Sequence, residues 1–344
     1  MVNRRLATVW LGVAQIAITS CLWGCGIRTP ASGNTVTRSA PARELRADVP
    51  NLPLPPEELG RRLERTPFTI TAADGAGAGV AGAKKLHLVF DDGFETDAKW
   101  KQTKNSGDSW NNSPRREIGA YEVQKFFLQP DEFIVPPSAP RCIPLDVYRA
   151  VDPDPQPNLP GVRCVFGLLS GWLSNVEQPA RAFDRTRFAS DPLYRDRFAA
   201  LNLLHYLIDH RDARANNFLM SRNPADPRIY SIDNGIAFGG VLYNFFIPHY
   251  NRVVVSGLPK AAVERLRNVG PRDFERLGVL AELRADESGV LRPVEPAANL
   301  DPERGTRLSG GQMQLGLSAN EIAAIRKRLG DVLARIDRGD LAVF

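Results

Sequence analysis

The chain has 344 residues, of which 43% are hydrophobic and 24% are charged, and its formal net charge is +5. This length is enough for two domains, or for one two-lobed domain with a sizeable core. The mild positive charge suits an anionic ligand, but no basic helix, zinc-ligand spacing or interleaving of basic and aromatic residues accompanies it. We therefore expect no nucleic-acid partner.

The first 25 residues are typical of a targeting segment. Two arginines precede an apolar run over residues 6–19, which is too short to span a membrane. The tetrapeptides that end at Cys21 and Cys25 both resemble the bacterial lipobox, and Cys21 fits better because Trp23 is bulky. A plain secretory signal is the alternative. Both interpretations predict an extracytoplasmic protein, and lipidation would anchor it to the membrane of the cell envelope.

A linker and a cysteine pair follow this segment. Residues 26–62 are rich in Pro, Ser, Ala and Arg and contain few apolar anchors, which predicts a disordered tether. Outside the cytoplasm a disulfide between Cys142 and Cys164 is permitted. Because Cys164 lies in an apolar run, a buried free thiol is the alternative.

The pattern changes at Phe68 to short alternating segments. They predict strands over residues 68–71, 85–90 and 94–102, followed by a helix over 115–128. A Gly/Ala run separates the first two strands, and its backbone amides could approach phosphates, although such a run can also be a flexible loop. The glycines that we single out there as candidate cofactor-binding residues are Gly77, Gly79 and Gly82.

The third predicted strand carries two candidate lysines. Enzymes that transfer phosphoryl groups hold the nucleotide phosphates with a strand lysine, which pairs with a helix glutamate. Lys99 and Lys101 share one face of the strand, so the sequence does not separate them cleanly. We favour Lys101, with Glu117 as its partner and Lys99 as a second cofactor-binding candidate. The alternatives are two solvated lysines and an ordinary acidic residue in the first turn of a helix.

A Pro-rich passage over residues 130–160 precedes an apolar strand over 164–169, and we place a hinge near residues 170–171. Beyond it the pattern predicts mainly helices, over residues 194–208, 260–268, 271–284 and 318–338. Ser318 and Glu321 form a plausible capping box for the last one. Residues 308–312 spell LSGGQ, the signature of ABC transporters, but that motif works opposite a Walker A loop and the chain has none.

The sequence HRDARANNF, which begins at His210, carries the strongest functional signal. Asp212 is followed five residues later by Asn217, and a short β-like segment delivers Asp233 in an Asp-Asn-Gly sequence. One carboxylate could orient an attacking hydroxyl, while an amide oxygen and a second carboxylate could bind Mg²⁺. We assign Asp212 the first role, with Lys101 and Glu117 as further catalytic residues, and Asn217 and Asp233 the second. Asn216 is an alternative to Asn217, and Asp212 could be an ordinary loop residue.

These motifs resemble the atypical branch of the kinase superfamily. Residues 217–219 (NFL) and 232–238 (IDNGIAF) are similar to sequences in type II phosphatidylinositol 4-kinases, and secretory-pathway and spore-coat kinases share the Asp-Asn-Gly. Residues 117–121 (EIGAY) resemble the Glu-x-x-Ala-Tyr helix of that group, which supports Glu117. The strand lysine there usually precedes a proline, whereas Lys101 precedes Gln102.

The resemblance implies an α+β fold of two lobes, a β-rich N-lobe over residues 63–170 and a helical C-lobe over 171–344, with ATP and magnesium as cofactors. The expected activity is phosphate transfer to a hydroxyl of a protein or a small molecule in the cell envelope. Because ATP is scarce outside the cytoplasm, a catalytically silent protein that binds a partner or a nucleotide is one alternative. Transfer of AMP by the same fold is another.

Overall fold

The computed structural model describes residues 49–76, 82–181, 183–239 and 252–344. The chain divides into two units, Met1–Glu44 and Leu45–Phe344, and all the described residues belong to the second. The candidate lipidation sites Cys21 and Cys25 and the glycines Gly77 and Gly79 lie outside the described residues. Among the helices that are described, none has the length and apolar character needed to cross a bilayer.

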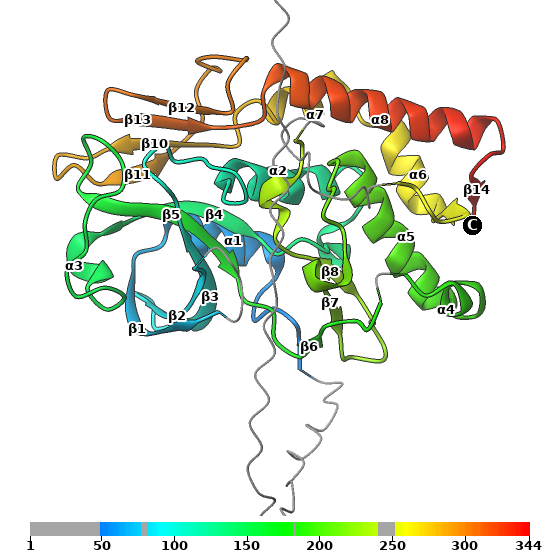
Figure 1. Ribbon diagram of the computed structural model, residues 1–344, viewed down its shortest axis with the longest axis horizontal. Helices are drawn as coiled ribbons and strands as arrows, with labels where there is room; N and C mark the ends of the chain where they lie inside the picture. The colour runs from blue at the N-terminus through cyan, green and yellow to red at the C-terminus, as the bar shows by residue number, and fades with distance from the viewer. Residues whose placement is uncertain (1–48, 77–81, 182, 240–251) are drawn as a thin grey trace, which may run out of the picture. The chain divides into compact units, whose positions relative to one another are not determined.

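An antiparallel sheet of five strands forms the N-terminal part of this unit (Figure 1). In spatial order its strands are β1 (Phe68–Gly75), β2 (Lys84–Phe90), β3 (Glu95–Gln102), β5 (Cys164–Gly171) and β4 (Ser138–Pro144). Successive residues of a strand point to opposite faces. On β2 and β3 the buried apolar residues therefore share one face with the core, while Lys85, His87, Asp97, Lys99 and the buried Lys101 share the other.

Helix α1 (Pro56–Arg65) packs on this sheet through Leu59 and Leu63, which are both fully buried. The boundary at residue 62 that the sequence predicted for the tether is therefore too late, because this segment is a helix from Pro56. Two leucines spaced four residues apart are enough to anchor the helix, and acidic residues in its first turn and arginines in its last turn complement its dipole.

Strand β4 lies within the Pro-rich passage, where the sequence predicted no strand. It pairs with β5 along seven residues, and Cys142 on β4 forms a disulfide with Cys164 on β5. Of the two alternatives for these cysteines, the structure contains the disulfide. The bridge lies inside an apolar cluster shared by both strands and by the C-terminal sheet.

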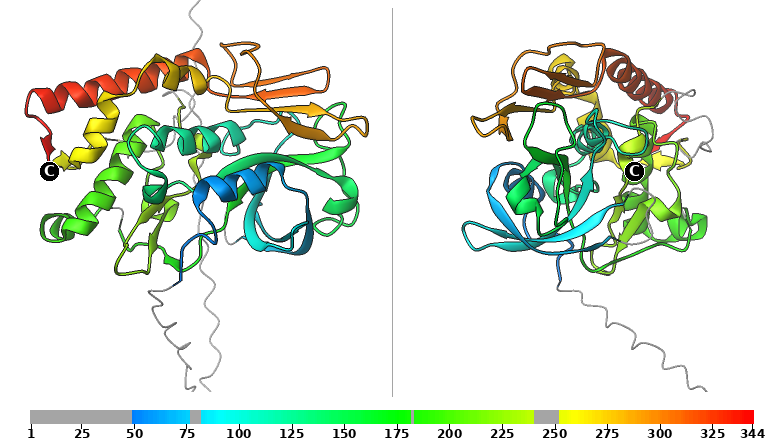
Figure 2. Two further views of the ribbon diagram at one scale, coloured as in Figure 1. Left: turned by 180° about the vertical axis from the view of Figure 1, so that it is seen from behind. Right: turned by 60° about the vertical axis from the view of Figure 1, so that its left-hand side comes forward.

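Helices dominate the C-terminal part (Figure 2). The main ones are α5 (Pro192–Leu207), α6 (Lys260–Arg267), α7 (Pro271–Arg276) and α8 (Ala319–Asp337). The capping box predicted at Ser318 and Glu321 is present at the start of α8. The α+β class is thus confirmed, with a β-rich N-terminal part followed by a mainly helical one.

One C-terminal segment differs from the prediction. The helix expected over residues 271–284 ends at Arg276, and the chain then enters a four-stranded antiparallel sheet. Its strands are β10 (Ala281–Ala285), β11 (Leu291–Val294), β12 (Thr306–Ser309) and β13 (Gln312–Leu315). The LSGGQ sequence is the hairpin turn between β12 and β13, where Gly310 and Gly311 have φ values of 54° and 76° that other residues rarely adopt.

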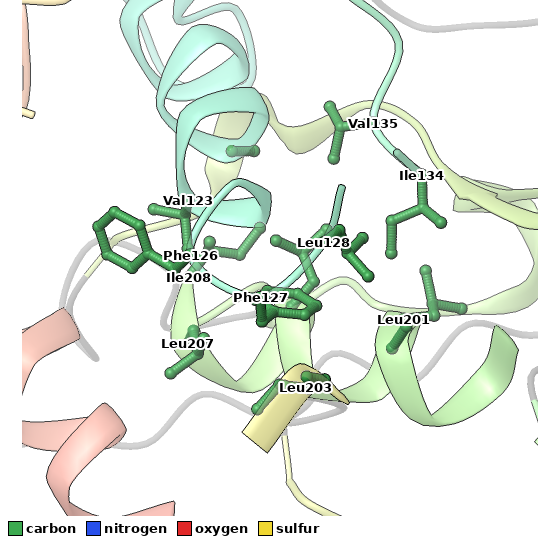
Figure 3. Packing of buried hydrophobic residues seen from close by; sticks show 14 of the residues in the cluster. Val123, Phe126, Phe127, Leu128, Ile134, Val135, Leu201, Leu203, Leu207 and Ile208 are labelled. Carbon is green, nitrogen blue, oxygen red and sulfur yellow. The ribbon is translucent and has the colours of Figure 1, made fainter. Parts of the chain in front are cut away.

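The remaining elements are one helix of 11 residues, α2 (Pro114–Gln124), and several short ones. The short ones are α3 (Leu145–Tyr148), α4 (Arg185–Ser190), β6 (Val176–Glu177), β7 (Phe218–Ser221), β8 (Ile229–Ser231), β9 (Gly257–Leu258), β14 (Ala342–Val343) and the 3₁₀ turns Pro130–Glu132, Ala215–Asn217 and Asn234–Ile236. The largest apolar cluster joins α2 and the segment after it to α5. Figure 3 shows Phe127 and Leu128 among Leu201, Leu203 and Leu207 in this cluster. This packing fixes α2 against the helical part.

A buried carboxylate holds the C-terminal sheet together. Glu282 on β10 is 1% exposed, and its two oxygens accept hydrogen bonds from Arg284, Gln312, Gln314 and the backbone N–H of Ala297. Burial would raise the pKa of this carboxyl, but these hydrogen bonds outweigh it and lower the pKa to about 2.

We expect Glu282→Ala to lower the free energy of unfolding by about 2–3 kcal/mol, because the buried Gln314 amide loses an acceptor and the hydrogen bonds from three further residues to the carboxylate are lost. Chemical denaturation measures this change. Arg284→Ala is the matched control and should cost less than about 1 kcal/mol, since the Arg284 side chain is 55% exposed. Equal losses in both variants would contradict the assignment.

Because the pKa of Glu282 is depressed in the folded protein, its contribution to stability is present above about pH 4.5 and is lost as the pH falls toward 2.

Candidate active site

A buried lysine lies between two carboxylates at the junction of the N-terminal sheet and the helical part. The Lys101 side chain on β3 is 4% exposed, and its Nζ lies 3.7 Å from Glu117 Oε1 on α2. The same Nζ donates a hydrogen bond to Asp233 Oδ1, in the loop after β8. Lys99 points the same way two residues earlier, but its side chain is 27% exposed and its Nζ lies 3.9 Å from Asp233 Oδ1. The geometry therefore distinguishes the two lysines that the sequence left open.

The ion pairs determine the protonation of this site. Burial alone would lower the pKa of Lys101, but the carboxylates of Glu117 and Asp233 outweigh it, so its pKa is raised. Burial would likewise raise the pKa of Asp233, yet Lys101 and Lys99 lower it. Lys101 is thus an ammonium and Asp233 a carboxylate at neutral pH.

The Asp233 loop is held from both sides. Asp233 adopts the left-handed conformation, with φ 62° and ψ 49°, and so turns the chain sharply after β8. The next backbone N–H, that of Asn234, donates to Glu117 Oε2 at 2.9 Å. The N–H of Ile232 donates to the carbonyl oxygen of Asn217 at 3.0 Å, which joins this loop to the loop of Asp212.

Asp212 lies at the bend between α5 and β7. Its carboxylate accepts hydrogen bonds from Asn217 Nδ2 at 3.0 Å and from Arg214 Nε at 2.8 Å. Asn217 is buried, whereas Asn216 is exposed and its amide oxygen accepts from Gln178 at 2.9 Å. Of the two asparagines, Asn217 is the one that faces the candidate site.

His210 is fully buried and contacts the ring of His205 edge-on at 5.0 Å between centroids. Burial lowers its pKa to about 4, even though Asp233 acts in the opposite direction. A neutral, buried imidazole of this kind packs and supports the loop. It agrees with a structural role for His210 beside Asp212.

The donor set around Asp233 suits a hard cation that also binds phosphate. With its amide nitrogen turned to Asp212, Asn217 has its amide oxygen as a candidate ligand, and Asp233 supplies a carboxylate. Within the described residues no three His, Cys, Asp or Glu side chains gather closely enough to hold a metal by themselves. A magnesium ion here would therefore depend on phosphate oxygens as well as on these two residues, as in nucleotide sites. Of the three candidate glycines Gly77, Gly79 and Gly82, the structure describes Gly82, which has φ 62°.

Several residues of the site were not predicted from the sequence. Arg214 pairs with Asp212, and its position two residues later was the only signal available. Asn234 was noted as part of the motif, but its link to Glu117 joins residues 117 positions apart, which no local pattern reveals.

The charged face of the sheet extends from Lys101 along β3 and β2. Asp97 Oδ1 lies 3.0 Å from His87 Nδ1, and Asp97 Oδ2 lies 2.6 Å from Lys85 Nζ. Glu95 Oε2 lies 3.3 Å from the other ring nitrogen of His87. This face carries alternating charges and not the apolar residues of the opposite face.

Comparisons with known proteins find fold similarity only. No protein-family model and no curated protein matches the sequence. Among solved structures, hydra Fam20 with sugar is 12% identical, with 80% of this chain and 86% of that chain covered and a TM-score of 0.49. The Golgi casein kinase is 12% identical, with 82% and 75% covered and a TM-score of 0.47.

We expect His87 to titrate above its usual pKa of 6.5, because its hydrogen bond to Asp97 stabilises the imidazolium more than burial destabilises it, and Glu95 adds to this effect. Its contribution to stability is then fully present below pH 6.5 and is lost as the pH rises through the raised pKa. NMR titration of the His87 ring measures the value directly. Asp97→Asn should lower it, and an unchanged value in that variant would contradict the pairing.

Proposed function

We propose that the chain is a phosphotransferase that uses ATP and magnesium and transfers the γ-phosphoryl group to a hydroxyl. The observation that carries this proposal is the buried Lys101 held between Glu117 and Asp233. A buried ammonium with two carboxylates is the arrangement that binds nucleotide phosphates and positions a metal beside them. The loop of Asp233 is joined to the loop of Asp212 and Asn217 by the hydrogen bond from the Ile232 N–H to the Asn217 carbonyl oxygen. Asp212 and Asn217 supply the remaining groups.

Each residue has a distinct task in this mechanism. Lys101, oriented by Glu117, binds the phosphates nearest the sugar, while Asn217 and Asp233 would hold magnesium. The bound cation would neutralise charge on the phosphates as the bond to the leaving group breaks. Asp212 orients the acceptor hydroxyl and accepts its proton, and Arg214 beside it can offset negative charge on the transferred group.

The location of the protein is part of the same proposal. The Cys142–Cys164 disulfide supports an oxidising compartment, in keeping with the signal and the lipobox of the sequence. We therefore place the enzyme outside the cytoplasm, anchored by lipid at Cys21, and its acceptor is a protein or a small molecule of the envelope. All the charged groups required for transfer are retained, which argues against a catalytically silent protein.

Labelled ATP tests the reaction. Purified protein with magnesium and [γ-³²P]ATP should release phosphate or label an acceptor, and Asp212→Asn should reduce the rate about 10²–10³-fold through loss of the base. [α-³²P]ATP is the parallel measurement. If [α-³²P]ATP labels the acceptor and [γ-³²P]ATP does not, the reaction is AMP transfer and not phosphate transfer. Turnover undiminished in Asp212→Asn would refute the role of Asp212.

Nucleotide binding tests the choice between the two lysines. Lys101→Met should abolish most of the increase in melting temperature that ATP and magnesium produce, because the buried contact to the phosphates is lost. Lys99→Met is the matched control on the same face of β3 and should keep most of that increase. A larger loss in Lys99→Met than in Lys101→Met would reverse the assignment. No nucleotide-dependent shift in the wild type would favour a protein without a nucleotide site.

A further inference from the structure

A chain of buried hydrogen bonds leads from helix α5 to the candidate active site. His205 Nε2 lies 2.8 Å from Ser231 Oγ, and Ser231 Oγ donates to Asn234 Oδ1 at 2.7 Å. His205, Ser231 and Asn234 are 2%, 0% and 1% exposed. Buried polar groups of this kind are costly unless they are hydrogen-bonded, so these bonds restrain the three side chains. The other polar atom of the Asn234 amide, Nδ2, is buried without a hydrogen-bond partner among the described residues.

The direction of this hydrogen-bond chain follows from the amide oxygen of Asn234 facing Ser231. An amide oxygen can only accept, so the Ser231 hydroxyl donates its proton to Asn234. The hydroxyl oxygen then accepts from His205, which therefore carries a proton on Nε2. Burial, and next to it His210, lower the pKa of His205 well below 6.5, which agrees with this neutral form. His205 is itself held by stacking on Phe218, at 5.1 Å between ring centroids.

The far end of this hydrogen-bond chain contacts the ion pair of Glu117 and Lys101. The backbone N–H of Asn234 donates to Glu117 Oε2 at 2.9 Å, and Glu117 Oε1 lies 3.7 Å from Lys101 Nζ. The side chain of Asn234 is thus held by Ser231, while its backbone holds Glu117. Because both bonds belong to one residue, loss of the side-chain bond to Ser231 would remove a restraint on the backbone that carries the N–H bonded to Glu117.

We propose that Asn234 is a positioning residue. Its side chain is held by Ser231 and His205, and its backbone N–H positions the Glu117 carboxylate beside the Lys101 ammonium. The inference rests on the proposed function, because the task of Glu117 is to orient Lys101 toward phosphate. A directional hydrogen bond suits this task better than an apolar contact, since it restricts rotation as well as distance. Small displacements of a positioned group are expensive in catalysis.

A double-mutant cycle tests the chain. Ser231→Ala should weaken binding of Mg·ATP about tenfold, as expected from the loss of buried hydrogen bonds. In a Glu117→Gln background the same change should have little further effect, because both act through Lys101. Calorimetry gives the dissociation constants. Ser221→Ala, which removes another buried serine hydroxyl at the end of β7, is the matched control and should leave binding unchanged.

Additive effects in the cycle, or equal weakening in Ser221→Ala, would overturn the proposal and leave Ser231 as a packing residue. Hydrogen exchange of the peptide that contains the Asn234 amide provides a second readout that needs no turnover. Its exchange should become faster in Ser231→Ala than in Ser221→Ala, and unchanged exchange would also overturn the proposal. A wild type that binds Mg·ATP but transfers no phosphate would refute the proposed function and still leave the cycle and the exchange measurable.

Discussion

The pairing of the Lys101 ammonium with Glu117 and Asp233 is the constraint on which the rest of the structure depends. A buried charge is tolerated only when it is paired, and a single lysine here requires two carboxylates from distant parts of the chain. One comes from α2 and the other from the loop after β8. The sheet, the helix and the loop must therefore meet at one point, and their packing can be understood as the means of holding that point.

Helix α2 is accordingly held on several sides. Arg115 and Arg116 both pair with Glu321 in the first turn of α8, and all three side chains are at most 10% exposed. At Gly119 a Cβ atom would lie 3.1 Å from Leu317 and 3.2 Å from Phe238, so only glycine lets these side chains approach this closely. Ile118 faces the apolar cluster shared with the C-terminal sheet. These contacts leave Glu117 little freedom to leave Lys101.

The sequence predicted the parts of the site that are local and missed those that are not. The loop of Asp212 and Asn217 and the turn at Asp233 follow from short motifs, because the relevant residues are neighbours in the chain. Lys101 was favoured over Lys99, but the sequence did not separate the two cleanly, since alternation assigns a face and the depth of burial depends on α2. The sequence of residues 281–285 (AELRA) is compatible with a helix as well as with a strand. Pairing with β11 and β13 makes the segment a strand. Helix α1 was assigned to the tether because two leucines are a weak signal until a sheet covers them.

If the proposed function holds, the charges of the site would let one arrangement serve with and without a nucleotide. Lys99 and Lys101 carry two positive charges, and Glu117 and Asp233 carry two negative ones, so the group is balanced as it stands. A polyphosphate brings negative charge that the lysines can bind, and the cation that accompanies it can take over the Asp233 carboxylate. Lys99 matters in this exchange even though it is the more exposed of the two lysines. Its charge adds to that of Lys101 in lowering the pKa of Asp233, and an ionised Asp233 is the form that would bind a metal.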